Sequence, residues 1–462
     1  MSTELTIVGG GLAGSEAAWQ AAERGMEVNL YEMRPHQETG AHQGQDLAEL
    51  VCSNSFGSAL PDRASGILMS ELQAMGSLLI SCAQEFAVPA GSALAVDRRA
   101  FAKAVTGRLA EHPRIRIVRE EVMDLPEGLC ILASGPLTSP ALSASLSDFT
   151  GEEHLYFFDA LSPIVEASSI DYEIVFRASR YARGKAEEGD YVNCPFTQDE
   201  YEQFVDALLS AERIPLRSFE SAIKHGVRAG ISHFFEGCLP VEIIAERGRK
   251  SLAYGPMRPV GLVDPRTGRQ QYAIVQLRQD DLAGDLYNLV GFQTNLTYAA
   301  QRHVFRKIPG LADAKFLRYG QMHRNTFVNS PKILKPSLQH RTQRNLFFAG
   351  QITGVEGYLG NIATGLLAGV NAVRFSRGQD LISLPKTSML GALCHYITHA
   401  SAERFQPMKA NLGIMPALED GRKRNRRERA MAHASRARGD FAVCWKAVGE
   451  HLRIAKHERI DT

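Results

Sequence analysis

Short apolar runs alternate with helix-forming stretches over the first third of the chain. Leu5–Val8 and Val28–Tyr31 are apolar enough for buried strands, and a helical stretch separates them. Further runs at Ile115–Val118 and Leu129–Leu132 continue the alternation, and the second leads into a Gly135-Pro136 turn. Because strands that alternate with helices form βαβ units, this region is predicted to build a parallel sheet.

The pattern changes in the middle of the chain and then returns. Strand-like pieces at 173–176 and 272–277 alternate with polar helical stretches such as 199–209. A buried strand at 345–350, a glycine-rich loop and a small-residue helix at 361–375 then resume the first pattern, and residues after about 385 are helical in pattern. We predict an α/β protein with a split Rossmann-like domain (1–165 and 321–385), an inserted α+β substrate domain (166–320) and a helical, basic C-terminal segment (386–462).

The turn after the first predicted strand has the spacing of a dinucleotide-binding motif. Gly9, Gly11 and Gly14 fit G-x-G-x-x-G. The first glycine allows the tight turn, the second lets a pyrophosphate approach the backbone, and the third lets the helix pack close to the strand. The helix N-terminus favours the pyrophosphate anion. Glu32, which lies 18 residues after Gly14, is placed to accept hydrogen bonds from a ribose. An ordinary strand-to-helix turn requires neither three spaced glycines nor this acid.

The second strand, glycine-rich loop and helix indicate which dinucleotide is bound. A helix N-terminus at this point can place positive potential near a flavin ring, although an ordinary βα unit would have the same pattern. Together with the first motif, this loop predicts FAD. The predicted FAD-binding residues are Gly9, Gly10, Gly11, Leu12, Ala13, Gly14, Glu32, Gly350, Gly354, Glu356 and Gly357.

Composition limits the other classes of partner. The 462 residues are 44% hydrophobic and carry a net charge of +1, so any nucleic acid must be bound by local basic patches. No apolar run is long enough to span a bilayer and no basic leader precedes the first strand, so we expect a cytoplasmic protein without a membrane partner. The seven cysteines include no C-x-x-C pair, which predicts reduced thiols and no metal site.

Two of the cysteines lie in settings that suit catalysis. Cys52 lies in a polar, turn-forming segment, and Cys238 lies between Gly237 and Leu239-Pro240. Neighbouring N–H groups or cations could lower the pKa of either thiol, although a buried apolar role is the commoner fate of cysteine. Cys82, Cys130, Cys394 and Cys444 lie in apolar or helical runs and are predicted to be structural, and Cys194 is left undecided.

Two polar segments are candidates for substrate contacts. His323, Arg324 and Asn325 lie just before the second glycine-rich segment and could line a substrate pocket, the alternative being a solvated loop. Residues 422–429 carry six Lys or Arg and one acid. From this run we select Arg424, Arg426 and Arg427 as candidate phosphate contacts, although a solvated helix would have the same composition.

Eight short segments are more specific than a general flavin signature. They are GGGLAGSEAAWQ at 9–20, YEMRP at 31–35, AELVCSNS at 48–55, VPAG at 88–91, AVDR at 95–98, FEGCLP at 235–240, MHRNTF at 322–327 and FAGQITGVEGY at 348–358. Through them the chain resembles the folate- and FAD-dependent tRNA uridine-5-methyltransferases (TrmFO), relatives of the GidA/MnmG flavoproteins. It departs from the family pattern at Gln45 and Gly57, where Lys and Arg are common.

The resemblance implies an activity and its partners. The activity is methylation at C5 of the T-loop uridine (position 54) of tRNA, with 5,10-methylenetetrahydrofolate as one-carbon donor, FAD as cofactor and NADH or NADPH as the flavin's reductant. Uracil C5 is a poor nucleophile until a thiolate adds at C6. Cys52 and Cys238 match the family's two important cysteines. We favour Cys238 as the C6 nucleophile and Cys52 as a second thiol near the flavin, and leave this division open. The predicted partners are folate and the T arm of tRNA. The sequence does not predict an oligomeric state.

Three other classes compete with this interpretation. A flavoprotein that modifies the wobble uridine of tRNA shares the nucleotide fold, but those chains are longer and lack the Cys52 and Cys238 contexts. A flavin disulfide reductase needs a close pair of cysteines, which is absent here, and a monooxygenase needs no tRNA surface. An FAD-containing protein that binds tRNA without catalysis is the remaining alternative.

Overall fold

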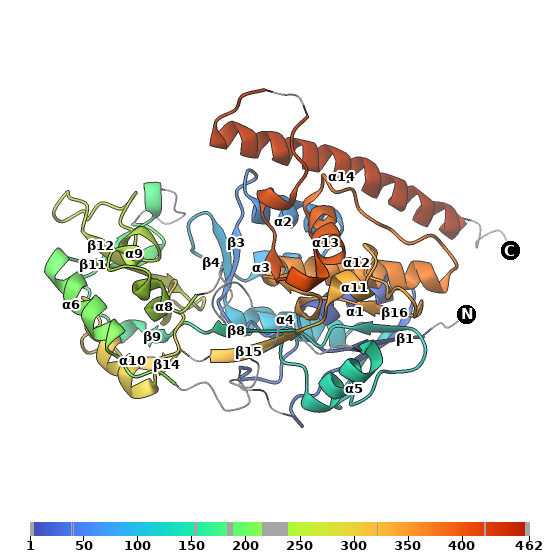
Figure 1. The fold of residues 1–462 in the computed structure, drawn as a ribbon, viewed down its shortest axis with the longest axis horizontal. Helices are drawn as coiled ribbons and strands as arrows, with labels where there is room; N and C mark the ends of the chain where they lie inside the picture. The colour runs from blue at the N-terminus through green and yellow to red at the C-terminus, as the bar shows by residue number, and fades with distance from the viewer. Residues whose placement is uncertain are drawn as a thin grey trace.

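The computed structural model describes residues 4–37, 39, 41–151, 155–182, 188–214, 239–320, 322–419 and 422–457. Figure 1 shows a larger body that contains both the first and the last part of the chain, with the middle of the chain forming a smaller body beside it. Two strands of the connection between these bodies pair with each other. They are β8 (Leu155–Ala160) and β15 (Met322–Phe327), which run antiparallel.

A five-stranded parallel sheet forms the centre of the larger body. Its strands are β1 (Glu4–Val8), β2 (Glu27–Tyr31), β6 (Ile115–Val118), β7 (Cys130–Leu132) and β16 (Leu346–Phe348), in the order β16-β7-β1-β2-β6. Alternate residues face opposite sides of the sheet. Ile7 and Ile131 pack into one apolar core, whereas Val8 and Leu132 pack into another on the opposite face. Both faces of the sheet are therefore covered, as expected of parallel strands.

Two helices, α1 (Leu12–Glu23) and α12 (Tyr358–Ser376), pack closely against each other. A Cβ atom on Gly365 would lie 2.1 Å from the carbonyl oxygen of Ala13, and one on Gly369 would lie 2.6 Å from that of Ala17. Since both neighbours are backbone atoms, this approach requires glycine at both positions. The small residues of α12 thus let this late segment of the chain pack directly on α1, at the start of the larger body.

The remaining elements of the larger body surround these two helices and the sheet. The helices are α2 (Ala64–Ala74), α3 (Leu78–Glu85), α4 (Arg98–Ala110), α5 (Pro140–Thr150), α11 (Ser330–Ile333) and α13 (Met389–His399). A small antiparallel sheet has the order β3-β5-β4, formed by β3 (Ser55–Ser58), β4 (Ala87–Val88) and β5 (Ala93–Val96). A short pair is formed by β17 (Val355–Glu356) and β18 (Met408–Lys409).

The smaller body contains a six-stranded antiparallel sheet. Its strands are β9 (Ile164–Glu166), β10 (Phe176–Ala178), β11 (Tyr191–Phe196), β12 (Ala273–Gln279), β13 (Leu286–Leu289) and β14 (Phe316–Arg318), in the order β10-β11-β12-β13-β9-β14. Its helices are α6 (Gln198–Leu209), α8 (Val241–Glu246), α9 (Ser251–Tyr254) and α10 (Tyr298–Phe305). Phe204, Phe292 and Phe305 are fully buried in its own apolar core.

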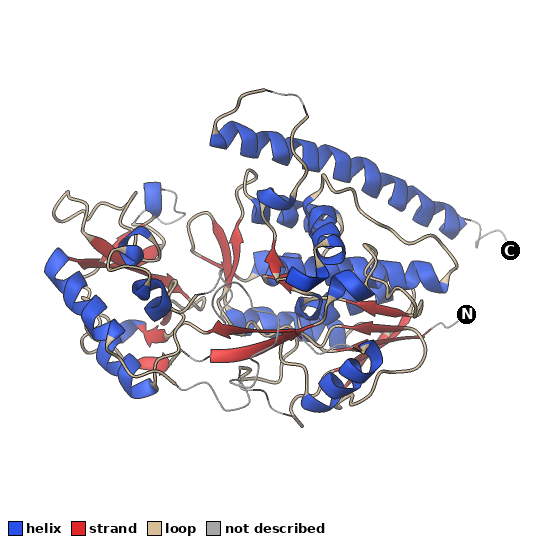
Figure 2. Ribbon diagram, viewed as in Figure 1, coloured by secondary structure: helices blue, strands red, loops and turns tan. Residues whose placement is uncertain are grey.

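The long helix α14 (Arg426–His457) lies across the top of the larger body in Figures 1 and 2. Ala430, Ala434, Ala437 and Phe441 recur every three or four residues and are buried, so one stripe of the helix packs on the body while the other faces solvent. In the described residues no single helix reaches the length and hydropathy of a membrane span. α2 and α3 meet the length and hydropathy of a span only when counted together, and the chain bends by 113° between them.

The predicted fold class is confirmed, and most predicted elements are found within a few residues of their expected ends. One prediction is wrong: the strand expected at 173–176 begins only at Phe176. The Asp171 side chain accepts the N–H of Glu173 at 3.0 Å, and the Asp171 carbonyl accepts those of Ile174 and Val175. This Asx-type turn overrides the β propensity of the apolar residues. β9 spans the domain boundary predicted at residue 165.

Candidate functional site: a dinucleotide cavity that adjoins Cys52

The three motif glycines have different structural roles. Gly9 has a φ of +105°, and a Cβ atom on it would lie 2.4 Å from the carbonyl oxygen of Ala133. A Cβ atom on Gly14 would lie 1.8 Å from the carbonyl oxygen of Gly9, so the start of α1 is pressed against the turn. In contrast, none of the described residues lies within 4 Å of the position a Cβ would take on Gly11. The first and third glycines are thus required by the fold, whereas the space beside Gly11 is open to a ligand.

The N-terminus of α1 faces this open space. In the described part of the chain, no side chain caps the helix at its N-cap residue Gly11. The first N–H groups of a helix need acceptors, and together with the helix dipole they attract an anion. Leu12 and Ala13, at this end, line a cavity. The arrangement suits a pyrophosphate.

Glu32 lies at the end of β2 and is 6% exposed. Its carboxylate accepts the N–H of Gly10 at 3.1 Å and the Nε of Arg34 at 2.9 Å, and the N–H of Arg34 also bonds to it. Burial raises the pKa of Glu32, but the hydrogen bonds and charge of Arg34 outweigh it and leave the pKa below its ordinary value. An ionised carboxylate accepts about four hydrogen bonds, so Glu32 retains capacity for a ribose hydroxyl.

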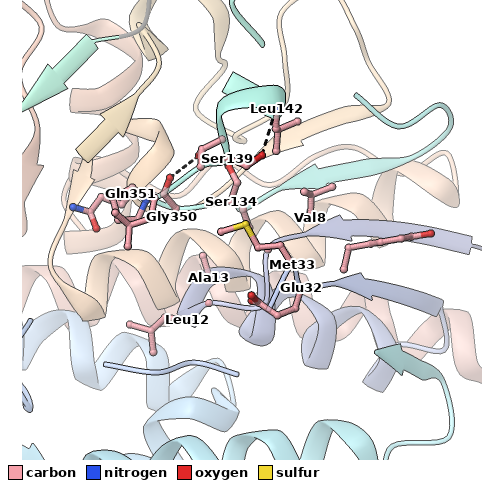
Figure 3. A pocket seen from close by; sticks show the side chains of 18 of the residues that line it. Val8, Leu12, Ala13, Glu32, Met33, Ser134, Ser139, Leu142, Gly350 and Gln351 are labelled. Atoms are coloured by element: carbon pink, nitrogen blue, oxygen red, sulfur yellow. Dashed lines mark hydrogen bonds between the residues drawn. The ribbon is translucent and has the colours of Figure 1, made fainter. Parts of the chain in front are cut away.

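A cavity of about 960 Å³ opens where the sheet strands end at their carboxyl side. Gly9 after β1, Met33 after β2, Ala133 after β7 and Gly350 after β16 all line it. Figure 3 shows Glu32, Met33, Leu12, Ala13, Ser134 and Gly350 around this cavity. The carboxyl edge of an open parallel sheet is where such folds bind nucleotides.

The second glycine-rich loop borders the same cavity. Gly350 and Gly357 have φ of +79° and +84°, which favour glycine, and Gly357 is the N-cap of α12 without a side-chain cap among the described residues. Gly354, with a φ of +81°, packs against the ring of Phe405 and does not line the cavity. The Oδ1 atom of Asn361, in the first turns of α12, is buried without a hydrogen-bond partner in the described residues. A ligand with an N–H group would satisfy it.

A second cavity of about 730 Å³ adjoins the first. Both are lined by Val51, Pro136, Leu137, Gln351, Tyr358 and Asn361. Cys52 lines only the second, as do Asn325, Glu356 and Gly357. The two cavities therefore bring the predicted thiol Cys52 next to the α12 end of the nucleotide site.

The segment that contains Cys52 is held by its backbone. The hydroxyl of Tyr358 accepts the N–H groups of Cys52 and Ser53, both at 3.0 Å, and donates to the carbonyl of Ser53 at 2.8 Å. Arg98 Nη1 donates to the carbonyl oxygens of Leu50 at 3.1 Å and Cys52 at 3.3 Å. These contacts fix the thiol-bearing turn between α12 and α4.

Three of the four cysteines predicted to be structural are buried and so differ from Cys52, whereas Cys444, on α14, is only partly buried. Burial raises the pKa of Cys82 to about 11 and those of Cys130 and Cys394 to about 12. Cys194, which the sequence left undecided, is fully buried and its pKa is also raised by burial. Cys52, by contrast, is only partly buried and lines a cavity. The buried thiols of Cys82, Cys130, Cys194 and Cys394 stay protonated and are therefore unreactive.

The other predicted residues are placed as follows. Asn325 is 4% exposed and lines the second cavity. His323 and Arg324 lie on β15, where their backbones pair with Asp159 and Phe158 of β8, and their side chains are outside the described part. Cys238 lies outside the described residues, so its predicted role stays a prediction. Gly10 and Gly14 do not line the first cavity; they shape the turn behind it.

The basic run meets the start of α14. Arg424 precedes the helix, and Arg426 and Arg427 open it and are exposed. Asn425 and Glu428 exchange backbone-to-side-chain hydrogen bonds of 3.1 and 2.9 Å, which form the helix cap. Positive charge at a helix N-terminus opposes the helix dipole, so these arginines do not serve helix stability.

Sequence reasoning missed several residues. Asn361 had no recognisable signal in a helix of small residues, and Arg98 was noted only as part of the AVDR segment. Arg318, on β14 of the smaller body, donates from Nη2 to the carbonyl of Cys52 at 3.4 Å. A contact across 266 residues of sequence could not be inferred from local pattern.

The doubly covered parallel sheet, the open end of α1 and the second glycine-rich loop together define a Rossmann-type flavoprotein. Residues 4–380 match the family described as glucose inhibited division protein A. The chain is 53% identical over 451 residues to methylenetetrahydrofolate--tRNA-(uracil-5-)-methyltransferase TrmFO of Moorella thermoacetica, covering 97% of this chain and 99% of that protein. It is 52% identical over 437 residues to the Bacillus pumilus protein of the same name, covering 95% and 98%. The chain belongs to the TrmFO family, within the GidA group.

A solved structure has a related fold. GidA of Aquifex aeolicus, in its form I crystal, superposes with a TM-score of 0.66 at 18% identity, over 99% of this chain and 80% of that one. At this identity the likeness concerns the fold.

The residues around the cavity fit FAD. The α1 terminus lacks a side-chain cap, Gly11 leaves open space, Glu32 keeps free acceptor capacity, and Asn361 has a buried acceptor without a partner in the described residues. A pyrophosphate would bind at the α1 terminus in the space beside Gly11. A ribose hydroxyl would donate to Glu32, and a ring N–H would donate to Asn361.

Proposed function

We propose that this chain is a methylenetetrahydrofolate- and FAD-dependent tRNA (uracil-5-)-methyltransferase that acts on the T-loop uridine. The observation that carries the proposal is that the cavity lined by Cys52 adjoins the dinucleotide cavity, with Tyr358 and Asn361 lining both. The names of the TrmFO relatives support the same activity. A uracil in the second cavity would lie beside both a thiol and the flavin end of the site.

The overall reaction balances with a nicotinamide reductant. The methylene group of the folate passes to C5, and NADH or NADPH with one proton supplies the two hydrogens that complete the methyl group and regenerate tetrahydrofolate. FAD, when bound, supplies the redox chemistry that links the nicotinamide to the one-carbon unit. Cys238 adds to C6 and so makes C5 nucleophilic, and Cys52 serves as the second thiol near the flavin.

The target base must leave the T loop to reach this cavity. Asn325, with its amide at the cavity wall, is placed to bond a uracil edge, and His323 and Arg324 of the same strand are proposed to contribute to the substrate pocket. Arg424, Arg426 and Arg427 bind tRNA phosphates without reading bases. Replacing these three arginines with glutamine should weaken tRNA binding and reduce its dependence on salt by about one unit of slope per lost contact. An unchanged salt dependence of tRNA binding would show that the three arginines lie on a solvated helix face and do not contact tRNA.

The deciding experiment is tritium release from tRNA carrying [5-³H]uridine, with FAD-loaded protein, methylenetetrahydrofolate and NADH or NADPH. We expect tritium release that requires both methylenetetrahydrofolate and the nicotinamide reductant. Absence of release with tRNA still bound would leave a non-catalytic FAD-containing tRNA-binding protein.

The roles of the two cysteines can be separated with 5-fluorouridine tRNA. Cys238→Ala should abolish the covalent complex, whereas Cys444→Ala, a control on α14, should leave it intact. A complex that persists in Cys238→Ala and disappears in Cys52→Ala would transfer the C6 addition to Cys52.

A further inference from the structure

Three guanidinium groups from three separate elements surround the Cys52 segment. Arg98 of α4 donates to the carbonyls of Leu50 and Cys52. Arg278 of β12 donates from Nε to Oδ1 of Asn54 at 2.7 Å. Arg318 of β14 donates to the carbonyl of Cys52 at 3.4 Å. The inserted domain therefore supplies two of the three cations that touch residues 52–54.

Among the described residues, only one of these three cations, Arg98, forms an ion pair. Asp280, 5% exposed, pairs with Arg98 through Nη2 at 2.9 Å and Nε at 3.1 Å. Four other carboxylates line the cavity beside Arg98 and Arg318, those of Asp46, Glu49, Asp97 and Asp281. Glu49 pairs with Arg34, Asp97 caps α4 and Asp281 accepts the N–H of Leu286. A buried cation without a paired anion is unfavourable, so a nearby anionic group would stabilise Arg278 and Arg318, which have no ion pair in the described residues.

Arg318 is the least satisfied of the three cations. Its Nε atom is buried without a hydrogen-bond partner in the described residues. Its pKa is lowered to about 10, first by burial and then by the like charge of Arg98. Asp280, Tyr358 and the Cys52 thiolate act in the opposite direction and raise it. The guanidinium stays protonated at neutral pH.

Electrostatic coupling between two groups is reciprocal: a thiolate that stabilises a guanidinium is itself stabilised by the same free energy. Tyr358, which also interacts electrostatically with Cys52, does not oppose this effect. Burial and then the charge of Cys52 raise the pKa of its hydroxyl, so it remains a neutral donor and acceptor.

We propose that Arg318 is a positioning residue that holds the Cys52 thiol in its reactive thiolate form, while Arg98 fixes the backbone that presents it. The inference rests on the proposed function, in which Cys52 is a reactive thiol. It assigns a task to the inserted domain beyond substrate contact: docking of β14 against the Cys52 segment completes the electrostatic environment of the thiol.

The test is the pH dependence of alkylation of Cys52 by iodoacetamide in the FAD-loaded full-length protein, followed on the Cys52 peptide by mass spectrometry. In Arg318→Met, which keeps the apolar stem and loses the charge, the midpoint should rise by about one pH unit or more. Arg318→Lys should restore most of the shift. The matched control is Arg99→Met, which removes an exposed cation from α4 in the same neighbouring cavity and should leave the midpoint unchanged.

An equal midpoint in Arg318→Met and the wild type would overturn the inference, whatever the methylation rate. If Arg318→Met does not fold, Arg318→Gln against Arg318→Lys makes the same comparison, and equal midpoints in that pair would overturn it too. Failure of the proposed function has a different signature: a wild type whose Cys52 midpoint depends on Arg318 but which releases no tritium from tRNA.

Discussion

Four helix N-termini in the larger body fall into two contrasting pairs. The first turns of α3 and α13 are each satisfied twice, by a serine N-cap and by a buried carboxylate from another helix. Glu16 accepts the N–H groups of Leu78 at 3.3 Å and Leu79 at 3.0 Å, and Glu71 accepts those of Met389 at 2.7 Å and Leu390 at 2.9 Å.

The N-termini of α1 and α12 have glycine N-caps and no side-chain cap among the described residues, and both border the cavities. Protein side chains thus accept the first N–H groups of α3 and α13. The first N–H groups of α1 and α12, which face a cavity, are left for a ligand. A glycine N-cap therefore indicates a ligand site only once the fold shows that a cavity lies in front of the helix.

The largest effect is expected from Gly14→Ala. Its methyl group would lie 1.8 Å from the carbonyl oxygen of Gly9, so the α1 terminus must move away from the turn. We expect a loss of about 3 kcal/mol or more in the free energy of unfolding together with loss of FAD. Urea denaturation and the flavin absorbance of the purified protein measure the two effects. Retention of both would show that the close contact is not required.

Removing a filled cap should cost stability without affecting the cofactor. Glu71→Ala leaves the N–H groups of Met389 and Leu390 buried without their acceptor, which should lower the free energy of unfolding by about 3 kcal/mol. Flavin affinity of the folded fraction should match the wild type. Equal losses of stability and flavin affinity would contradict the division of the four helix ends.

The pH dependence of stability gives a finer test of the same cap. Burial raises the pKa of Glu71 to about 7 from its ordinary 4.5. Between these values the native state binds more protons than the unfolded state, so stability must fall as the pH rises through this window and level off above it. Chemical denaturation should show a fall of about 3 kcal/mol. Glu71→Gln should flatten that part of the profile, and an unchanged profile would assign the slope to other groups.

Gly11→Ala should have the smallest effect on the fold and a selective effect on the cofactor. Gly11 has a φ of −74°, which alanine adopts readily, and no atom of the part of the chain that the structure describes lies within 4 Å of the added methyl group. Stability in the absence of flavin should therefore be unchanged. FAD affinity, measured by titration of the apoprotein, should fall about 10- to 100-fold because the methyl group occupies the space of the pyrophosphate. Unchanged affinity would remove the pyrophosphate from this position.

The local parts of this organisation could be predicted from the sequence. Gly9, Gly11, Gly14 and Glu32 belong to one βα unit, so their spacing alone predicts a nucleotide-binding turn, and Cys52 was found from its local polar context. In contrast, the strand predicted at 173–176 was displaced by the Asp171 turn, since a short apolar run does not show where its hydrogen bonds begin.

The parts that could not be predicted depend on contacts between distant segments. Glu71 caps a helix 318 residues away, and Arg318 reaches Cys52 across 266 residues. In sequence, Glu71 is an ordinary helical glutamate and Arg318 an ordinary strand cation, and only burial reveals their roles. The division of functional labour among α1, α12 and the Cys52 segment required the fold.

The most direct test of the account is a crystal structure of the protein with FAD bound. The account predicts pyrophosphate oxygens within hydrogen-bond distance of the N–H groups at the start of α1, and a flavin ring that reaches Asn361 and borders the cavity of Cys52. A flavin bound with the α1 terminus empty, or with its ring away from Cys52, would contradict it.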